Sequence, residues 1–114
     1  MRVFRWRDSG REIGHFDSRL FTHFRLARSG GEAAVSAVEL NSGGVIGRHE
    51  AGARQLFVIV TGSGEVIGRD GEVVPVAAGD AVVWELGEEH ETRSAEGLLA
   101  IVLEGGGIDP AQPA

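Results

Sequence analysis

Short apolar segments recur along the chain and are separated by turns rich in glycine. Ala34–Leu40, Leu56–Thr61 and Leu98–Glu104 are rich in the β-branched and other apolar residues that favour strands. Alternation of apolar and polar residues predicts two more strands, at Met1–Arg7 and Phe21–Ala27. Shorter strands are expected at Glu65–Gly68, Glu72–Val76, Ala81–Glu85 and His90–Arg93. No segment of useful length shows the periodicity of an amphipathic helix.

The turns between these segments carry strong sequence signals. Asn41-Ser42-Gly43-Gly44 follows one strand, and Arg69-Asp70-Gly71 forms the tip of a hairpin. Gly62-Ser63-Gly64 is expected to end the strand at Leu56–Thr61 with a hairpin turn. Strands at this spacing, separated by such turns, are typical of a sandwich or jelly-roll barrel. We therefore predict an all-β fold in a single domain.

Two of the predicted strands are apolar on both faces. Leu56–Val60 and Leu98–Leu103 lack the alternation of a strand that has one face in water. Their outer faces therefore need a cover. A second copy of the chain would provide it, and we predict a homodimer. The alternative is that the N-terminal strand and the tail cover these faces within one chain.

Composition narrows the class of protein and of partner. The 114 residues suffice for one domain with its own core. The absence of cysteine excludes disulfides and thiolate metal sites and fits the cytoplasmic location that we predict. A net charge of −6 argues against nucleic acid or an anionic membrane as a partner. The N-terminus lacks the apolar stretch of a signal peptide, and no apolar segment is long enough to cross a bilayer.

Two of the four histidines lie in segments with a distinctive spacing of glycines. The segments read GVIGRHEAGARQLFVIVTGSG and GDAVVWELGEEHET. In the first, Gly43 precedes His49 by six positions, and Gly62 follows. In the second, Gly79 and Gly87 precede His90.

This pattern resembles the two sequence motifs of the cupin superfamily. The chain is similar to a small single-domain cupin of the RmlC-like jelly-roll type, with motif 1 at about 43–62 and motif 2 at about 79–94. The resemblance implies a double-stranded β-helix, that is, a jelly-roll barrel. We expect one barrel domain over residues 1–107 and a flexible tail at 108–114.

The resemblance also implies a site for a divalent metal ion inside the barrel. His49 matches the first histidine of the family's ligand set and His90 matches the last. Ala51 stands at the second histidine position, and Gln55 stands where the family has glutamate. We therefore expect His49, Gln55 and His90 to be the metal ligands, with iron, nickel, zinc, manganese or copper as the ion. No organic cofactor is predicted.

The same residues predict a pocket for a small organic molecule, walled by Ala51, Phe57 and Trp84. Two functions stay open. The first is a metal-dependent enzyme, an oxygenase or isomerase of unknown substrate. The second is a non-catalytic, metal-free dimer that binds a small molecule or has a structural role. In the simplest alternative, His49, Gln55 and His90 hydrogen-bond only to one another and to water. A sugar epimerase that pairs histidine with tyrosine is excluded, because the chain has no tyrosine.

Overall fold

The computed structural model describes residues 1–111, and its regular structure is almost entirely β-strand. The strands are β1 (Arg2–Arg5), β2 (Arg11–Glu12), β3 (Thr22–His23), β4 (Ala27–Ser29), β5 (Ala34–Leu40), β6 (Gly44–Glu50), β7 (Gln55–Ile67), β8 (Val73–Ala77), β9 (Asp80–Trp84), β10 (Glu89–Ser94), β11 (Leu98–Glu104) and β12 (Ile108–Pro110). Two single 3-10 turns are η1 (Trp6–Ser9) and η2 (His15–Asp17). The predicted all-β fold is confirmed. No helix within residues 1–111 is long and apolar enough to span a membrane.

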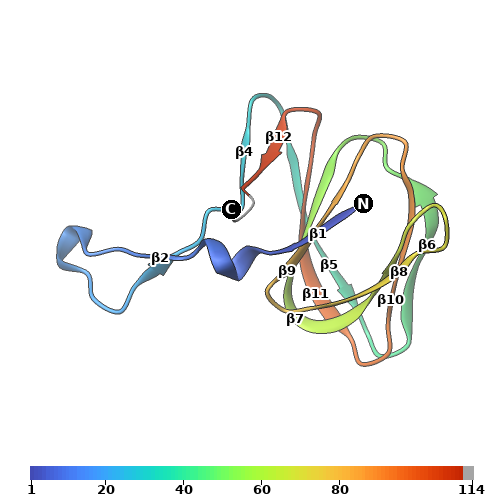
Figure 1. The fold of residues 1–114 in the computed structure, drawn as a ribbon, viewed down its shortest axis with the longest axis horizontal. Helices are drawn as coiled ribbons and strands as arrows, with labels where there is room; N and C mark the ends of the chain where they lie inside the picture. The colour runs from blue at the N-terminus through green and yellow to red at the C-terminus, as the bar shows by residue number, and fades with distance from the viewer. Residues whose placement is uncertain (112–114) are drawn as a thin grey trace.

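The barrel consists of two antiparallel layers that share the long strand β7 (Figure 1). The first half of β7 pairs with β9 and β11, and β1 and β5 extend that layer on either side. The second half pairs with β8 and β10, and β6 follows β10. Because one strand belongs to both layers, the sheet folds over onto itself as a jelly roll.

The glycines in the middle of β7 do not form the hairpin turn expected from the sequence. The strand runs without a break from Gln55 to Ile67 and crosses from one layer to the other at Gly62 and Gly64. Gly62 has a φ of 84°, and a Cβ there would lie 2.1 Å from the carbonyl oxygen of Gly97. Glycine thus lets the strand bend and lets the neighbouring backbone approach closely. The glycines that predicted a hairpin turn instead mark this bend, because glycine favours both a turn and a bend within a strand.

The core between the layers is built from side chains that point inward from both sheets. Phe57, Ile59, Val82, Trp84 and Ala100 come from the first layer and are almost fully buried. Val66 and Val76 close this core from the second layer. These side chains form a packed core between the layers. The candidate site lies beside this core.

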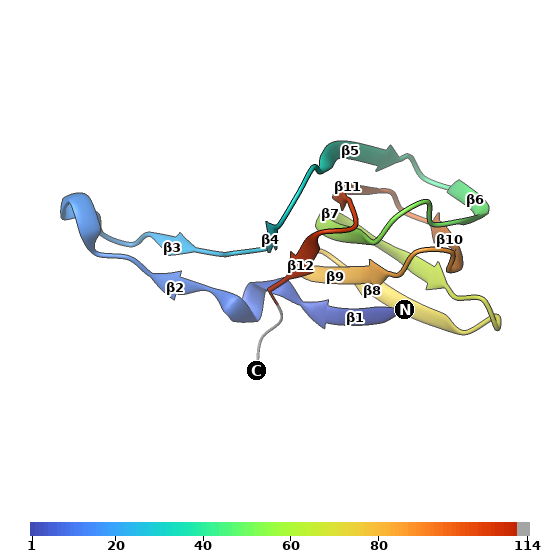
Figure 2. The same ribbon diagram turned by 90° about the horizontal axis from the view of Figure 1, so that it is seen from above.

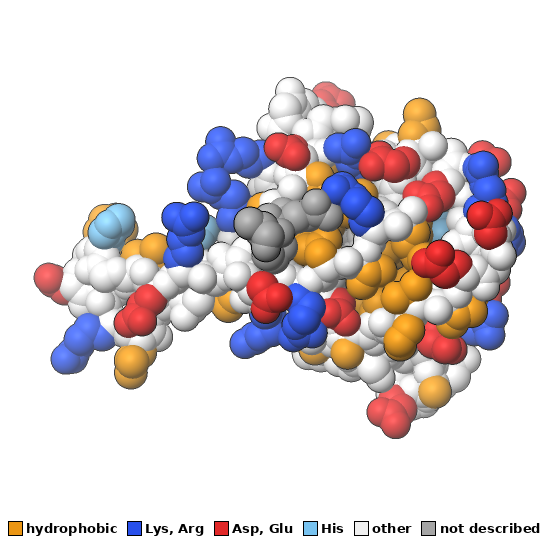
Figure 3. All heavy atoms as spheres, in the orientation of Figure 1, with side chains coloured by type: hydrophobic (Ala, Val, Ile, Leu, Met, Phe, Trp, Pro, Cys, Tyr) orange, Lys and Arg blue, Asp and Glu red, His pale blue; other side chains and the backbone are white. Residues whose placement is uncertain are grey.

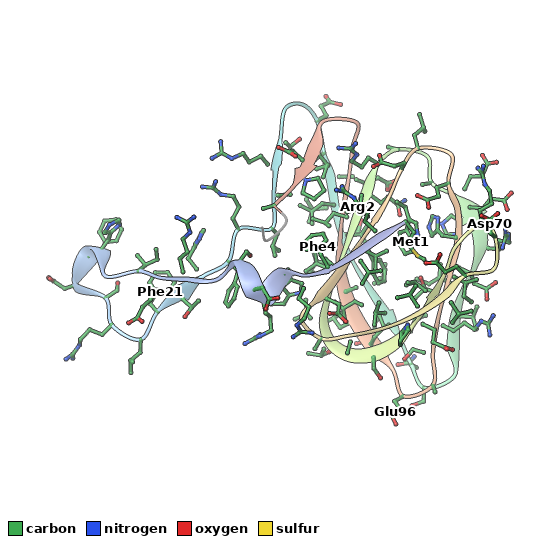
Figure 4. All side chains as sticks on the ribbon, in the orientation of Figure 1. Met1, Arg2, Phe4, Phe21, Asp70 and Glu96 are labelled. Carbon is green, nitrogen blue, oxygen red and sulfur yellow. The ribbon has the colours of Figure 1, made fainter. Side chains whose placement is uncertain are left out.

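The outer face of the first layer is covered by the chain itself. Leu56, Val58 and Val83 pack there against Phe4 and Trp6 from the N-terminal segment and against Ile108 of β12 (Figure 4). The apolar outer faces of Leu56–Val60 and Leu98–Leu103 therefore do not by themselves require a second copy. The alternative cover expected from the sequence, the N-terminal strand and the tail, is the one observed.

The expected flexible tail is partly wrong. Residues 108–110 form β12, which pairs with β4. Ile108 is buried, because its side chain fills the apolar cluster on the outer face of the sheet. The end of the expected tail, residues 112–114, lies outside the described residues.

A long hairpin extends away from the barrel (Figure 2). We call residues 10–26 the arm; it contains β2, η2 and β3. At its base, the Phe24 ring packs edge to face on Trp6 at 5.3 Å, and Arg7 lies over both rings. At its tip, Phe16 and Leu20 are 96% and 97% exposed. The strand predicted at Phe21–Ala27 is thus divided between β3 in the arm and β4 beside the barrel.

Candidate functional site

His49 and His90 form a cross-strand pair in which His90 is buried and His49 is exposed. His49 lies on β6 and His90 lies directly opposite it on β10. Directly opposed residues of antiparallel strands share one face of the sheet. The two imidazole ring centres are therefore only 4.4 Å apart, with the rings tilted by 55°. The pairing of β6 with β10 therefore brings the histidines of the two motifs together.

Backbone carbonyls fix the tautomer of both histidines. Nδ1 of His49 lies 2.7 Å from the carbonyl oxygen of Gly47, and Nδ1 of His90 lies 3.0 Å from that of Glu88. A carbonyl oxygen only accepts, so each Nδ1 carries the proton and donates it. In the neutral form of each ring, Nε2 then keeps its lone pair and is a hydrogen-bond acceptor.

Burial beside Trp84 keeps His90 neutral. Its ring stacks on Trp84 with the ring centres 4.0 Å apart, and Phe57 packs against the same indole. Burial lowers the pKa of His90 below its usual range, because the charged form is poorly solvated there. The Glu88 carbonyl opposes this shift, and nearby His49 adds to it. His90 therefore offers a neutral imidazole at neutral pH.

The two histidines line a cavity of about 200 Å³ between the layers, which we call the barrel cavity. Its polar lining residues are Ser36, His49, Gln55, His90, Thr92 and Glu104. Its apolar lining residues are Val38, Ile46, Phe57, Trp84 and Val102. Neither lysine nor arginine is among these residues.

The structure places five of the six predicted site residues at this cavity. His49, Gln55, Phe57, Trp84 and His90 all line it. Ala51 does not, because its side chain is buried in the core cluster instead. The other two histidines lie elsewhere, with His15 on the arm tip and His23 in a separate surface hollow beside Arg11 and Arg25.

The residue that sequence reasoning missed is Glu104, at the end of β11. Leu98, Ala100, Val102 and Glu104 alternate along the strand, so Glu104 points to the same inner face as the buried members of that row. Counting this alternation from Leu98 would have found it. Glu104 also pairs directly with Gln55 of β7, which places the two side chains next to each other.

A larger and more open groove lies elsewhere on the surface, between β7, β8 and the turn before β11. Its strongest charged groups are already paired. Asp80 accepts hydrogen bonds from Arg5 and from the Ala77 amide, and Arg93 pairs with Glu91. The carboxylates of Glu65 and Glu96 also line the groove, but the groove has no pair of histidines like the one at the barrel cavity.

Comparison with known proteins is consistent with this geometry. A family model described as a cupin domain matches residues 36–107, which is most of the barrel. The chain belongs to the cupin family. A search of curated protein sequences finds no match.

Solved cupin structures share the fold over most of this chain. The DMSP lyase DddQ from Ruegeria pomeroyi is 25% identical, with a TM-score of 0.60 over 64% of this cupin and 38% of that protein. This cupin thus spans well under half of the lyase. A predicted oxalate decarboxylase from Thermotoga maritima is 24% identical, with a TM-score of 0.57 over 75% and 68% of the two chains. An RmlC-like cupin from Shewanella frigidimarina is 21% identical, with a TM-score of 0.60 over 70% and 68%.

The donor atoms at the barrel cavity do not fit a resident catalytic metal ion. Such ions are commonly held by three protein ligands, among them histidines and a carboxylate that offsets the charge. Here two imidazole nitrogens and the neutral amide of Gln55 are the expected set. Within residues 1–111, no three histidine, cysteine, aspartate or glutamate side chains are placed to hold a metal together. The expected role of His49, Gln55 and His90 as metal ligands stays a prediction that this geometry does not favour.

Proposed function

We propose that this cupin binds a small polar organic molecule in the barrel cavity, without a resident metal ion. The proposal rests on a set of polar groups at the barrel cavity that have no hydrogen-bond partners. The side chains of Gln55 and Glu104 make no hydrogen bond or ion pair with any described residue, and neither does Nε2 of His49 or His90. Apart from His90, which is buried, these groups are exposed or half-buried at the mouth and wall of one cavity, where they are free to hydrogen-bond a ligand. A bound molecule supplies the missing partners here.

The walls of the cavity fit the same function. Phe57 and Trp84 give apolar contact area beside the polar groups, which is the usual composition of a small-molecule site. A volume of about 200 Å³ lies below the roughly 300–1,000 Å³ of pockets for drug-sized ligands. The ligand is therefore smaller than a typical drug molecule.

Proton transfer is the second candidate function, and His90 is the observation that favours it. A neutral imidazole held in one tautomer and facing a ligand site is the form of histidine that accepts a proton from a bound molecule. This step needs no metal. It keeps an isomerase within the proposal, whereas the donor set gives no support to a metal-dependent oxygenase.

The working unit in this proposal is a homodimer, which we now place at the arm. The side chains of Phe16 and Leu20 are almost fully exposed, and the arm that carries them extends away from the barrel (Figure 2). Exposed apolar groups at the end of a projecting element are typical of an interaction site. β5 offers a place for them, because it pairs only with β11 and Val35 on it is 65% exposed.

The uneven distribution of charge along the chain favours a second copy as the partner. Residues 1–30 carry seven arginines and three acidic residues, whereas the rest of the chain carries four arginines and fourteen acidic residues. On the face shown in Figure 3, basic side chains gather where the arm meets the barrel. The basic N-terminal segment of one copy therefore attracts the acidic barrel of the other. Twofold symmetry would repeat the contact, so each arm tip would lie on β5 of its partner.

Nuclear magnetic resonance of the two tryptophan indole groups tests the ligand-binding proposal. Trp84 lines the cavity, whereas Trp6 lies on the outer face and donates its N–H to the Ile59 carbonyl at 3.1 Å. A library of small amines, polyols and organic acids should contain molecules that shift the Trp84 signal and leave the Trp6 signal unchanged. Loss or conversion of a molecule during the same experiment would identify a reaction and favour proton transfer.

Filling the cavity is the decisive control. Val102→Phe places a larger side chain in the cavity wall and should abolish the Trp84 shifts. Val45→Phe makes the same change at an exposed position of β6 outside the cavity, and it should leave them intact. Binding that survives Val102→Phe in a folded protein, or a library without any binder, would contradict the proposal.

A further inference from the structure

The charge of the barrel cavity comes from a single residue. Glu104 is the one charged side chain among its lining residues, and no arginine or lysine reaches it. The three arginines adjacent in sequence to cavity residues are engaged elsewhere, and Arg93 pairs with Glu91. Arg48 pairs with Glu89 and the Arg69 carbonyl, and Arg54 pairs with Glu85 and the Ile108 carbonyl. The cavity therefore has a negative charge that no described residue neutralises.

The neighbours of Glu104 add to the preference of the cavity for a ligand that donates hydrogen bonds. Gln55 lies opposite Glu104 in the register of β7 and β11, so an amide oxygen can join the carboxylate in accepting hydrogen bonds. On the histidine side, each Nδ1–H is donated to a backbone carbonyl, so each Nε2 also accepts. Glu104, Gln55 and the two Nε2 atoms thus offer acceptors to a donor on the ligand, while the indole N–H of Trp84, which has no partner, is a donor that a hydroxyl oxygen of the same ligand would satisfy.

We infer that the barrel cavity takes a small organic amine, whose ammonium group binds at Glu104 and Gln55 while a second donor group reaches Nε2 of His49 or His90. This inference rests on the proposed function and adds the class of ligand. An ammonium group carries three N–H donors and the positive charge that the Glu104 carboxylate needs as a partner. A hydroxyl or a second amine on the same molecule would satisfy the histidines.

An organic acid of the same size would fit this cavity poorly. Its carboxylate would lie near the carboxylate of Glu104, and the neutral form of each imidazole has no proton on Nε2 to donate to it. Like charges brought together in the cavity repel, so the carboxylate of Glu104 disfavours an anionic ligand. The structure therefore predicts selectivity by charge and not only by size.

Three matched probes test this selectivity: 2-aminoethanol, ethylene glycol and glycolate. They are close in size and share a hydroxyl group, and they differ in carrying a positive, zero or negative charge. Their dissociation constants are measured from the Trp84 indole shifts of the full chain. We expect 2-aminoethanol to bind about tenfold more tightly than ethylene glycol, the size of effect typical of one charge-assisted hydrogen bond, and glycolate to bind most weakly.

Two variants remove one carboxylate each. Glu104→Gln keeps the shape of the side chain and should bring the affinity for 2-aminoethanol down to that for ethylene glycol, with ethylene glycol itself unchanged. Glu96→Gln makes the same chemical change in the exposed turn before β11, outside the cavity, and should leave the preference intact (Figure 4). Because only one atom changes at each site, both variants should fold, and circular dichroism checks this.

The outcomes separate this inference from the proposed function. If the probes bind but the amine has no advantage, or if its advantage survives Glu104→Gln, the amine inference is wrong and the cavity remains a ligand site. If glycolate binds best, the charge argument is reversed and also wrong. If none of the three probes shifts Trp84 and the wider library also contains no binder, the proposed function fails, and the inference fails with it.

Discussion

The barrel and the arm show how the same residue types acquire opposite roles in one chain. Leu56 in the barrel is fully buried between β9 and β11, whereas Leu20 in the arm is almost fully exposed. Gly62 in the barrel is held against the backbone of Gly97, whereas Gly14 in the arm has open space around it. The barrel therefore depends on internal packing, while the arm leaves apolar side chains exposed at its tip, where we propose the contact with a second copy.

Because of this difference, substitutions in the barrel should affect the stability of the fold, whereas substitutions in the arm should affect association between copies. Changes at tightly packed barrel positions should lower the free energy of unfolding, because buried groups lose contacts that nothing replaces. Changes at the arm tip should leave the folded barrel intact and alter its association with a partner. The predictions below exploit matched pairs of positions, one in each environment.

The glycine pair should give the largest effect. Gly62→Ala places a Cβ against the Gly97 carbonyl at a φ that alanine rarely adopts, and should lower the free energy of unfolding by about 2–6 kcal/mol. Gly14→Ala meets nothing within 4 Å and has a φ of −103°, so it should be neutral within about 0.5 kcal/mol. Urea denaturation measures both. Equal effects at the two positions would contradict the packing assigned to the bend in β7.

Removing a buried side chain from the barrel should come next. Leu56→Ala leaves a cavity under the outer cover of the sheet and should cost about 2–5 kcal/mol. Leu86→Ala, in the exposed turn before β10, is the matched control and should cost less than about 0.5 kcal/mol. Thermal unfolding at one protein concentration compares the two. A small loss for Leu56→Ala would mean that the outer cover formed by Phe4, Trp6 and Ile108 packs loosely.

The arm tip should affect association and not folding. Leu20→Asp removes an apolar contact that is repeated in a symmetric dimer, so about 3 kcal/mol should be lost and the dimer should weaken on the order of a hundredfold. Leu86→Asp makes the same change at another exposed leucine on the barrel and should leave association unchanged. Analytical ultracentrifugation measures both. A wild-type protein that stays monomeric at micromolar concentration would refute the arm-mediated dimer.

Acidification should give the smallest effect. The pKa of His90 is lowered in the folded chain, so the unfolded chain binds this proton at a higher pH. The contribution to stability is therefore complete above the unfolded pKa and is lost as the pH falls through that value towards the folded pKa. The melting temperature should drop between about pH 7 and pH 5, near the usual histidine pKa of about 6.5.

A variant isolates the part of this drop that belongs to His90. His90→Asn removes the titrating ring and should make the decrease shallower over that pH range, even if its melting temperature is lower throughout. His15→Asn, at the exposed arm tip, should leave the slope unchanged. An unchanged slope in His90→Asn would show that other groups cause the loss of stability.

Several elements could be read directly from the pattern of residues. Ala34–Leu40 and Leu98–Glu104 form strands with the predicted bounds, because their apolar and β-branched residues suit only a sheet. The glycine spacing around His49 and His90 identified the family. Two local predictions were wrong, the hairpin at Gly62-Ser63-Gly64 and the start of the flexible tail. In both, a distant segment, the Gly97 backbone or the outer apolar cluster, decided the conformation.

The candidate site was predictable to a similar degree. The resemblance of the two motifs to those of cupins gave His49, Gln55 and His90, because these residues stand at ligand positions of the family. Glu104 was not found, because it lies far from both motifs in the sequence and reaches the cavity only through the pairing of β11 with β7. Ala51 was assigned to the pocket by its motif position, but the packing of the core withdraws it.

The sequence by itself determined the class of fold, the family and the two histidines, because alternation, turn residues and motif spacing are local properties of the chain. The tertiary structure decided how these parts combine. It placed an unpaired carboxylate in the lining of the cavity that the histidines share, covered the outer sheet with both ends of the described chain and left an apolar arm tip exposed. Each of these results depends on contacts between residues far apart in sequence, and no local pattern records such contacts.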